Sequence, residues 1–175
     1  EIKNATSFDI CTYAFSDEFS LALGHDPIPR VDRSQSFNPF DLIAEPRGTR
    51  LEACLSDVEK TIDDYFTKHQ DKNHQALVIL LSDGAIDDHE AALEQAQRLM
   101  DTPKVTLTSI YMKRFVDPDS VYYSWKEASG KIDKNRTWTT DEVLAFDERT
   151  AELFKDFASD GAHYEASVNP DDIRN

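Results

Sequence analysis

The run ALVILLSDG, residues 76–84, constrains the fold of this chain more than any other stretch. It carries no charge before Asp83, and it ends in an Asp-Gly turn. A short, bounded apolar run of this kind predicts a strand buried on both faces, as in parallel sheets. Parallel strands need long crossover connections, which are usually helical. The rest of the chain should therefore alternate helices with strands.

The remaining sequence shows this alternation. We predict helices where apolar residues recur at three- and four-residue spacing, and strands where β-branched and aromatic residues gather. The predicted helices cover 51–68, 89–100 and 139–161, and the predicted strands cover 6–15, 76–84, 104–113 and 162–168, with SLALG (20–24) as a short edge strand. We therefore expect an α/β fold, a doubly wound and mostly parallel sheet with helices on both faces, in a single domain over 1–175.

Two segments fall outside this pattern. Residues 24–48 hold four of the seven prolines and read as a loop. Residues 115–138 form an irregular insertion that is too long for an ordinary connection. The insertion carries Tyr122, Tyr123, Trp125 and Trp138, residue types that are enriched in interface hot spots. We predict that at least two of these rings contact a protein partner; the alternative is that they pack onto the domain itself.

Four motifs in order resemble the von Willebrand factor A (vWA) domain family. TYAFSDE resembles the family's second strand, and RGTRLEACL its glycine-threonine turn and the following helix. VILLSDG resembles the strand that ends in Thr-Asp-Gly, with Ser82 in place of the threonine, and LFKDFASDGAHYEAS the final helix and strand. The resemblance covers nearly the whole chain except the insertion at 115–138. It implies a vWA/Rossmann-like fold and a protein-binding module.

The resemblance also implies a divalent-cation site at the carboxyl edge of the sheet, with magnesium as the ion. Thr49 matches the family's threonine ligand, and Asp83 matches an aspartate that acts through water. Each residue has a structural alternative, because Thr49 could cap the helix from Leu51 and Asp83-Gly84 suits a turn. The metal could also have been lost, leaving a metal-free scaffold.

The Asp-x-Ser-x-Ser pattern at Asp32, Ser34 and Ser36 matches the family's first metal loop in letters only. The preceding residues, GHDPIPR, cannot form a central strand because proline interrupts the ladder. The family's first strand and its loop are therefore missing, and the domain is incomplete at its N-terminal side. The chain begins at Glu1 rather than at methionine. We expect an upstream segment, or a protein partner, to supply the missing strand.

The net charge of −15 bears on the partners. A chain this acidic repels nucleic acid and anionic lipid, so we expect neither as a partner. No apolar run approaches the roughly 20 residues needed to span a bilayer, so we expect no membrane insertion. It attracts cations and basic protein surfaces. No secretory signal is visible, and Cys11 and Cys54 do not form a disulfide framework, so we expect both thiols to be reduced and buried in a cytoplasmic protein.

An enzyme is the rival class. The five glycines form no phosphate-binding loop, and no serine lies in a nucleophile elbow. His89 lies near Asp83, Asp87 and Asp88, an acidic turn that could hold a metal for hydrolysis, although Asp87 and Glu90 also suit a capping box for the next helix. We therefore expect a non-enzymatic vWA-like interaction module in a larger protein or complex, with a metal-dependent hydrolase as the alternative.

Overall fold

The structure is a computed structural model that describes residues 9–16, 19–23, 48–70, 73–113, 115–126, 131–160 and 164–167. The chain separates into two compact units, which are described one at a time. Unit 1 covers residues up to 74 together with 87–95, and unit 2 covers 75–86 together with 96–175. Helix α2 (His89–Asp101), predicted at 89–100, contributes its first turns to unit 1 and its last turns to unit 2.

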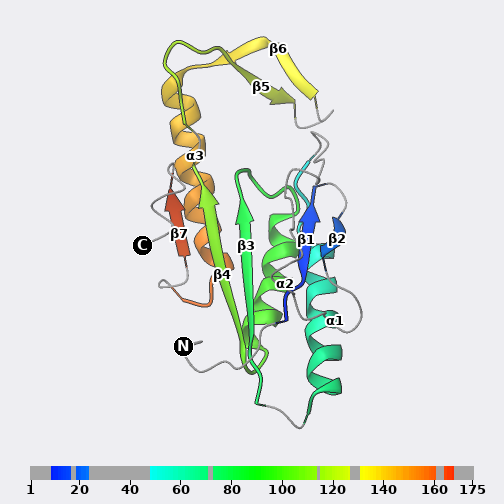
Figure 1. The fold of residues 1–175 in the computed structure, drawn as a ribbon. Helices are drawn as coiled ribbons and strands as arrows, with labels where there is room; N and C mark the ends of the chain where they lie inside the picture. The colour runs from blue at the N-terminus through cyan, green and yellow to red at the C-terminus, as the bar shows by residue number, and fades with distance from the viewer. Residues whose placement is uncertain are drawn as a thin grey trace, which may run out of the picture. The chain divides into compact units, whose positions relative to one another are not determined.

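Unit 1 contains a β-hairpin and a long helix (Figure 1). Strand β1 (Thr12–Phe15) pairs antiparallel with β2 (Phe19–Leu23), with Phe15 opposite Phe19. This pairing confirms the predicted edge strand and the second half of the strand predicted at 6–15. Residues 1–8 lie outside the described part of the chain.

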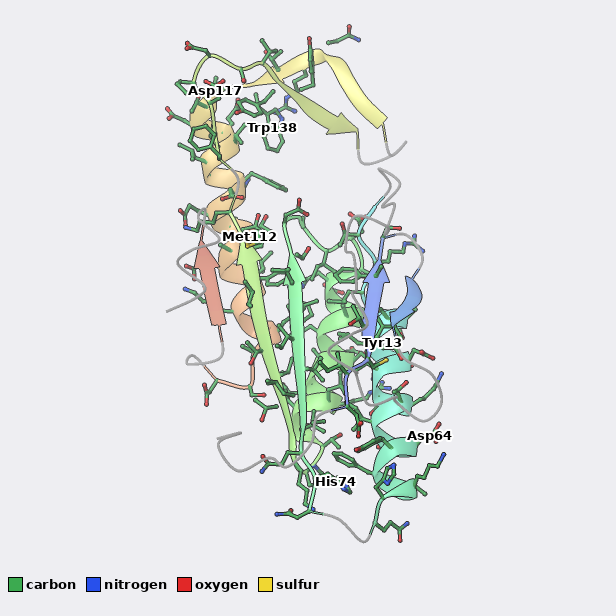
Figure 2. All side chains as sticks on the ribbon, viewed as in Figure 1. Tyr13, Asp64, His74, Met112, Asp117 and Trp138 are labelled. Carbon is green, nitrogen blue, oxygen red and sulfur yellow. The ribbon has the colours of Figure 1, made fainter. Side chains whose placement is uncertain are left out.

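Helix α1 (Glu52–Lys68) follows the predicted bounds closely. Its buried face is formed by Cys54, Leu55 and Ile62, at the spacing that the sequence pattern requires. The hydroxyl of Tyr13 on β1 donates to Oδ2 of Asp57 at 3.0 Å (Tyr13 is labelled in Figure 2). The hydroxyl of Tyr13 also lies 2.8 Å from Oγ1 of Thr61, so polar contacts join β1 to this helix.

Unit 2 contains a three-stranded parallel sheet in the order β3–β4–β7 (Figure 1). The strands are β3 (Ala76–Ser82), β4 (Val105–Met112) and β7 (Tyr164–Ser167). The register between β3 and β4 runs without interruption from Ala76 opposite Val105 to Ser82 opposite Tyr111. The prediction of a parallel sheet with alternating helices and strands is confirmed at this level.

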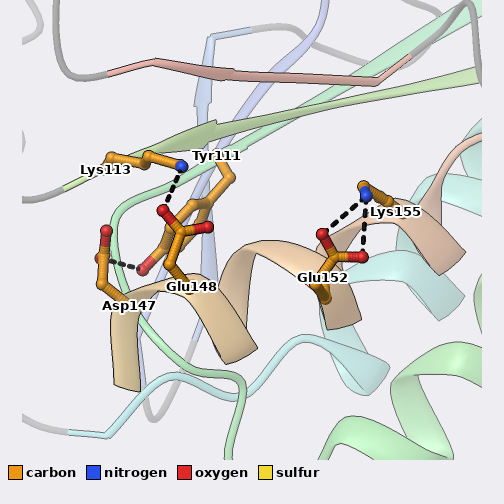
Figure 3. Close-up of polar contacts among 6 residues, drawn as sticks. All are labelled: Tyr111, Lys113, Asp147, Glu148, Glu152 and Lys155. Carbon is orange, nitrogen blue, oxygen red and sulfur yellow. Dashed lines mark hydrogen bonds and ion pairs between the residues drawn. The ribbon is translucent and has the colours of Figure 1, made fainter. Parts of the chain in front are cut away.

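One face of β4 builds the core of unit 2. Leu107, Ser109 and Tyr111 are completely buried and alternate along the strand, as the side chains of one sheet face must. The ring of Tyr111 lies 5.4 Å from that of Phe154 at the end of α3 (Thr140–Phe154). Its hydroxyl donates to the buried carboxylate of Asp147 at 2.8 Å, so the buried acid has a partner (Figure 3).

Helix α3 starts where predicted and ends earlier. Thr139 and Glu142 form the expected capping box. The predicted helix runs to Gly161, whereas α3 ends at Phe154 and is followed by the short 3-10 helix η3 (Lys155–Phe157). The chain leaves the helix because Ser159 pairs with β4: its N–H donates to the carbonyl of Leu107, and its Oγ accepts from the Leu107 N–H.

The sequence analysis predicts that the insertion at 115–138 is irregular, and this prediction is wrong. The insertion contains the antiparallel strands β5 (Tyr122–Lys126) and β6 (Lys131–Trp138), with Tyr122 opposite Trp138. The register shifts between Tyr123 and Ser124, whose partners are Thr137 and Asp133, so the pairing of the hairpin is interrupted there. The sequence hides this hairpin because five charged residues interrupt its alternation between 126 and 134.

Candidate functional site

Thr49, the predicted metal ligand, is held by its backbone. Its N–H donates to Oδ2 of Asp87 at 2.8 Å, and its carbonyl accepts from the Asp87 N–H at 2.7 Å. The side chain is half-buried, and its hydroxyl makes no hydrogen bond to any residue that the structure describes. The hydroxyl is therefore chemically free to act as an oxygen ligand.

The alternative role of Thr49, as cap of helix α1, is wrong. The N-cap residue is Leu51, whose apolar side chain cannot accept a hydrogen bond from the first turn of the helix. The carboxylate of Asp88 takes this role from a distant part of the sequence: Oδ1 accepts from the Leu51 N–H at 2.9 Å, and Oδ2 accepts from the Glu52 N–H at 3.0 Å. A carboxylate at this position satisfies two helix donors and interacts favourably with the helix dipole.

Asp87 and Asp88 thus clamp the turn before α1. The sequence analysis predicts other roles for these residues. Asp87 could form a capping box with Glu90, or both aspartates could bind a metal in a turn with His89. Both carboxylates instead accept backbone N–H groups of residues 49–52. No local sequence signal could have revealed this pairing, because the partners are 36 to 38 positions apart.

Asp83 follows the carboxyl end of β3, in unit 2. Its side chain is exposed, and its carboxylate makes no hydrogen bond within the described ranges. The Oγ of Ser82 accepts from the N–H of Gly84 at 3.4 Å, which is consistent with the predicted turn. The carboxyl end of a parallel strand is where open α/β sheets usually bind ligands.

Thr49 lies in unit 1 and Asp83 in unit 2, so a shared magnesium site stays a prediction. In the described residues, no group of three or more His, Cys, Asp or Glu side chains is arranged to hold a metal ion. Asp32, Ser34 and Ser36 lie outside the described residues.

The segment between β4 and β5 is ordered around Asp117. Its Oδ1 accepts from the Asp119 N–H at 2.9 Å, and its Oδ2 accepts from the Ser120 hydroxyl at 2.9 Å. These two bonds lower the pKa of Asp117, so its carboxylate stays ionised at neutral pH. The hydroxyl of Tyr122 accepts from the Asp117 N–H at 2.8 Å and completes the turn.

The four aromatic residues of the insertion divide into two groups. Tyr122 holds the Asp117 turn, and the ring of Trp138 lies 5.3 Å from Phe146 on α3 in an edge-to-face arrangement (Asp117 and Trp138 are labelled in Figure 2). The hydroxyl of Tyr122 therefore bonds within the insertion, whereas the ring of Trp138 packs against α3. The ring of Tyr123 is 51% exposed, and the side chain of Trp125 lies outside the described set.

Three large apolar side chains are exposed beside the Asp117 turn. They are Phe115 at 84%, Val121 at 64% and Tyr123 at 51% exposed. Phe115 and Val121 lie between β4 and β5, and Tyr123 is the second residue of β5. The sequence analysis singles out Tyr123 but not Phe115 or Val121, because exposure cannot be read from residue type.

The two cysteines are free thiols, of which Cys54 is buried and Cys11 is half-buried. Burial, with a smaller contribution from the charge of Asp57, raises the pKa of Cys54 to about 12. Burial also raises the pKa of Cys11. Thiols of this kind are poor nucleophiles at neutral pH, because the thiolate is the reactive form.

Comparison with protein-family models, with curated proteins and with solved structures finds no match to this chain. Among the helices that the structure describes, none combines the length and the apolar character needed to cross a bilayer.

Proposed function

We propose that this chain is a vWA-like protein-protein interaction module that binds a protein partner at the carboxyl end of its parallel sheet. The observation that carries the proposal is the exposure of Phe115, Val121 and Tyr123 in the segment that leaves this end. Full burial of a Phe or Val side chain is worth about 1.5–3 kcal/mol, which these residues do not gain within the described chain. Contiguous exposed apolar patches mark binding surfaces, and we propose that these three side chains form such a patch.

The support under these side chains favours a binding role. The turn beneath them is fixed by the hydrogen bonds of Asp117 and Tyr122, and the hairpin is held to α3 by the Trp138–Phe146 pair. A rigid platform reduces the entropy lost on binding. The exposed residues can therefore act as anchors without first being ordered by the partner.

Charge defines the chemistry of the partner. Asp117 stays ionised, and the side chain of Asp119 is exposed beside it. The whole chain carries a net charge of −15. The best match is a protein surface with an apolar pocket surrounded by lysine and arginine, because complementary charges speed association and exclude other partners.

The finer fold assignment belongs to the same proposal. The order β3–β4–β7, with all pairs parallel, is compatible with one half of a doubly wound sheet of the vWA/Rossmann kind in a single domain over 1–175. The vWA resemblance implies that Thr49, as a direct ligand, and Asp83, through water, are the residues that would hold magnesium; Asp83 is exposed, and the Thr49 hydroxyl makes no described hydrogen bond. A metal would then contribute to the contact with the partner.

Site-specific photo-crosslinking tests the proposal. A photoreactive amino acid in place of Phe115 should form a covalent adduct with one protein, at a peptide rich in lysine or arginine. Leu153 on α3 is the matched control, since it is 50% exposed and lies away from the hairpin in sequence. The second variant, Asp119→Lys, should reduce the Phe115 adduct. Equal adducts from both positions, or insensitivity to Asp119→Lys, would contradict the proposal.

A further inference from the structure

The exposed apolar side chains of the proposed binding surface lie on both sides of one turn. Phe115 precedes the turn that starts at Asp117, whereas Val121 and Tyr123 follow it. The conformation of this turn therefore sets the spacing between the two halves of the surface. A partner that contacts both halves at once requires that this spacing be held closely.

The turn itself is closed by three local hydrogen bonds. The carbonyl of Asp117 accepts from the Ser120 N–H at 3.1 Å, the bond typical of a β-turn. Oδ1 of Asp117 accepts from the Asp119 N–H at 2.9 Å, and Oδ2 accepts from the Ser120 hydroxyl at 2.9 Å. All three bonds join residues within 117–120, so they fix the turn but not its position relative to strand β5.

Tyr122, the first residue of β5, connects the turn to the strand. Its hydroxyl accepts from the Asp117 N–H at 2.8 Å and donates to the Asp117 carbonyl at 3.3 Å. One hydroxyl therefore bonds both backbone groups of a residue five positions earlier. These two bonds tie the chain before the turn to the strand that follows it.

The hairpin gives this hydroxyl a fixed base. Tyr122 lies opposite Trp138, and residues directly opposite in an antiparallel pair have Cβ atoms about 4.5–5.5 Å apart. The ring of Trp138 lies 5.3 Å from that of Phe146 on α3 (Trp138 and Asp117 are labelled in Figure 2). Tyr122 is half-buried whereas Tyr123 is exposed, as alternation along a strand requires.

We infer that Tyr122 is the positioning residue of the binding surface: its hydroxyl holds Phe115 at one spacing from the residues that follow the turn, and so decides which partner fits. This inference rests on the proposed function, since it concerns the same surface. The two adjacent tyrosines then have different roles, because Tyr123 contacts the partner and Tyr122 holds the segment that carries Phe115.

A positioning role differs from a general role in stability. The bonds of Tyr122 lie at a partly exposed turn, where water can replace a lost partner. Tyr122→Phe should therefore loosen the segment around Asp117 without unfolding the strands of the sheet.

Hydrogen exchange on the protein as cells make it tests the first step. In Tyr122→Phe the Asp117 amide should exchange roughly 2–10-fold faster, the range expected for one lost hydrogen bond, and Leu107 in the buried strand β4 should be unchanged. Tyr65→Phe is the matched control, because its hydroxyl donates to Oδ2 of Asp9 on another part of the chain at 2.6 Å. Unchanged exchange at Asp117, faster exchange at Leu107, or an equal response to the control would overturn the inference.

Crosslinking from a photoreactive amino acid at position 115 tests the second step. Tyr122→Phe should lower the yield of the partner adduct roughly 2–10-fold, since the partner must then order the segment on binding, and Tyr65→Phe should not lower it. An adduct that Tyr122→Phe leaves unchanged would overturn this inference and leave the proposed function standing. The absence of any adduct without these substitutions would overturn both.

Discussion

Oδ1 of Asp88 accepts a hydrogen bond from the backbone N–H of Leu51 at 2.9 Å, across 37 positions of sequence. With the second bond to Glu52, this carboxylate caps helix α1 from the segment that starts α2. The start of α1 thus depends on a residue that sequence patterns assign to another helix.

Replacement of Asp88 should loosen the start of α1. We expect Asp88→Ala to cost about 1–2 kcal/mol, the upper range for a lost cap. The amides of Leu51 and Glu52 should then exchange roughly 5–30-fold faster in the assembled protein. Asp83→Ala is the control, because it removes an exposed carboxylate without a described hydrogen bond. An equal response to both substitutions would contradict the capping role.

The Cys54 thiol should remain protonated well above neutral pH. With Cys11→Ser to remove the other thiol, alkylation of Cys54 by iodoacetamide should stay slow until the pH approaches 12. Because burial raises the folded pKa of Cys54 above the ordinary thiol value of 9.0, this group favours the folded state fully below pH 9 and loses that contribution as the pH rises toward 12. Fast alkylation at pH 8 would contradict the burial of this thiol.

Magnesium should bind weakly or not at all to the chain 1–175. Thr49 offers one direct oxygen ligand and Asp83 one that acts through water, whereas magnesium dehydrates reluctantly and needs a fuller ligand shell. Titration calorimetry should show no binding in the micromolar range. Micromolar binding that disappears in Thr49→Ala would contradict this prediction, and Asp32, Ser34 and Ser36 would be tested next.

Two aromatic residues of the insertion should have different roles, Trp138 in stability and Tyr123 in partner binding. Trp138→Ala should lower stability by about 0.5–1.5 kcal/mol from the lost ring pair with Phe146, in addition to lost burial. Tyr123→Ala should leave stability within about 0.5 kcal/mol of the parent and weaken partner binding. Chemical denaturation of the assembled protein measures the change in stability. The yield of the crosslink from a photoreactive residue at position 115 measures the change in partner binding. A stability loss of equal size in both variants would assign all these rings to packing.

The sequence predicts the positions of the helices and strands better than it predicts contacts between residues that are distant in the chain. The apolar spacing of α1 and the uncharged run of β3 are local properties, and both elements lie where expected. The predicted end of α3 at 161 is wrong, because the helix ends where Ser159 pairs with Leu107, a contact between residues distant in sequence. The hairpin β5–β6 was missed because charged residues mask its alternation.

The candidate site was predictable only in part. Asp83 follows its strand as expected and is exposed, while the contacts of Thr49 with Asp87 could not be foreseen from spacing. Phe115 was overlooked because its exposure depends on the path of the chain after β4. Contacts between residues that are distant in the chain, and the exposure of individual side chains, therefore cannot be predicted from a single sequence.

The central expectation from the vWA resemblance is that an upstream segment, or a protein partner, supplies a strand that completes the sheet at β3. Leu77, Ile79 and Leu81 are each about half-exposed without it. The burial that they forgo amounts to roughly 2–5 kcal/mol at the usual value per side chain. A whole domain has only about 5–15 kcal/mol of stability, so the loss is a large part of the total.

Thermal unfolding of the isolated chain 1–175, followed by far-UV circular dichroism, tests this claim most directly. The account predicts a broad change in signal without a cooperative transition at ordinary temperatures. A single sharp transition at about 45–65 °C, as in an ordinary complete domain, would contradict it.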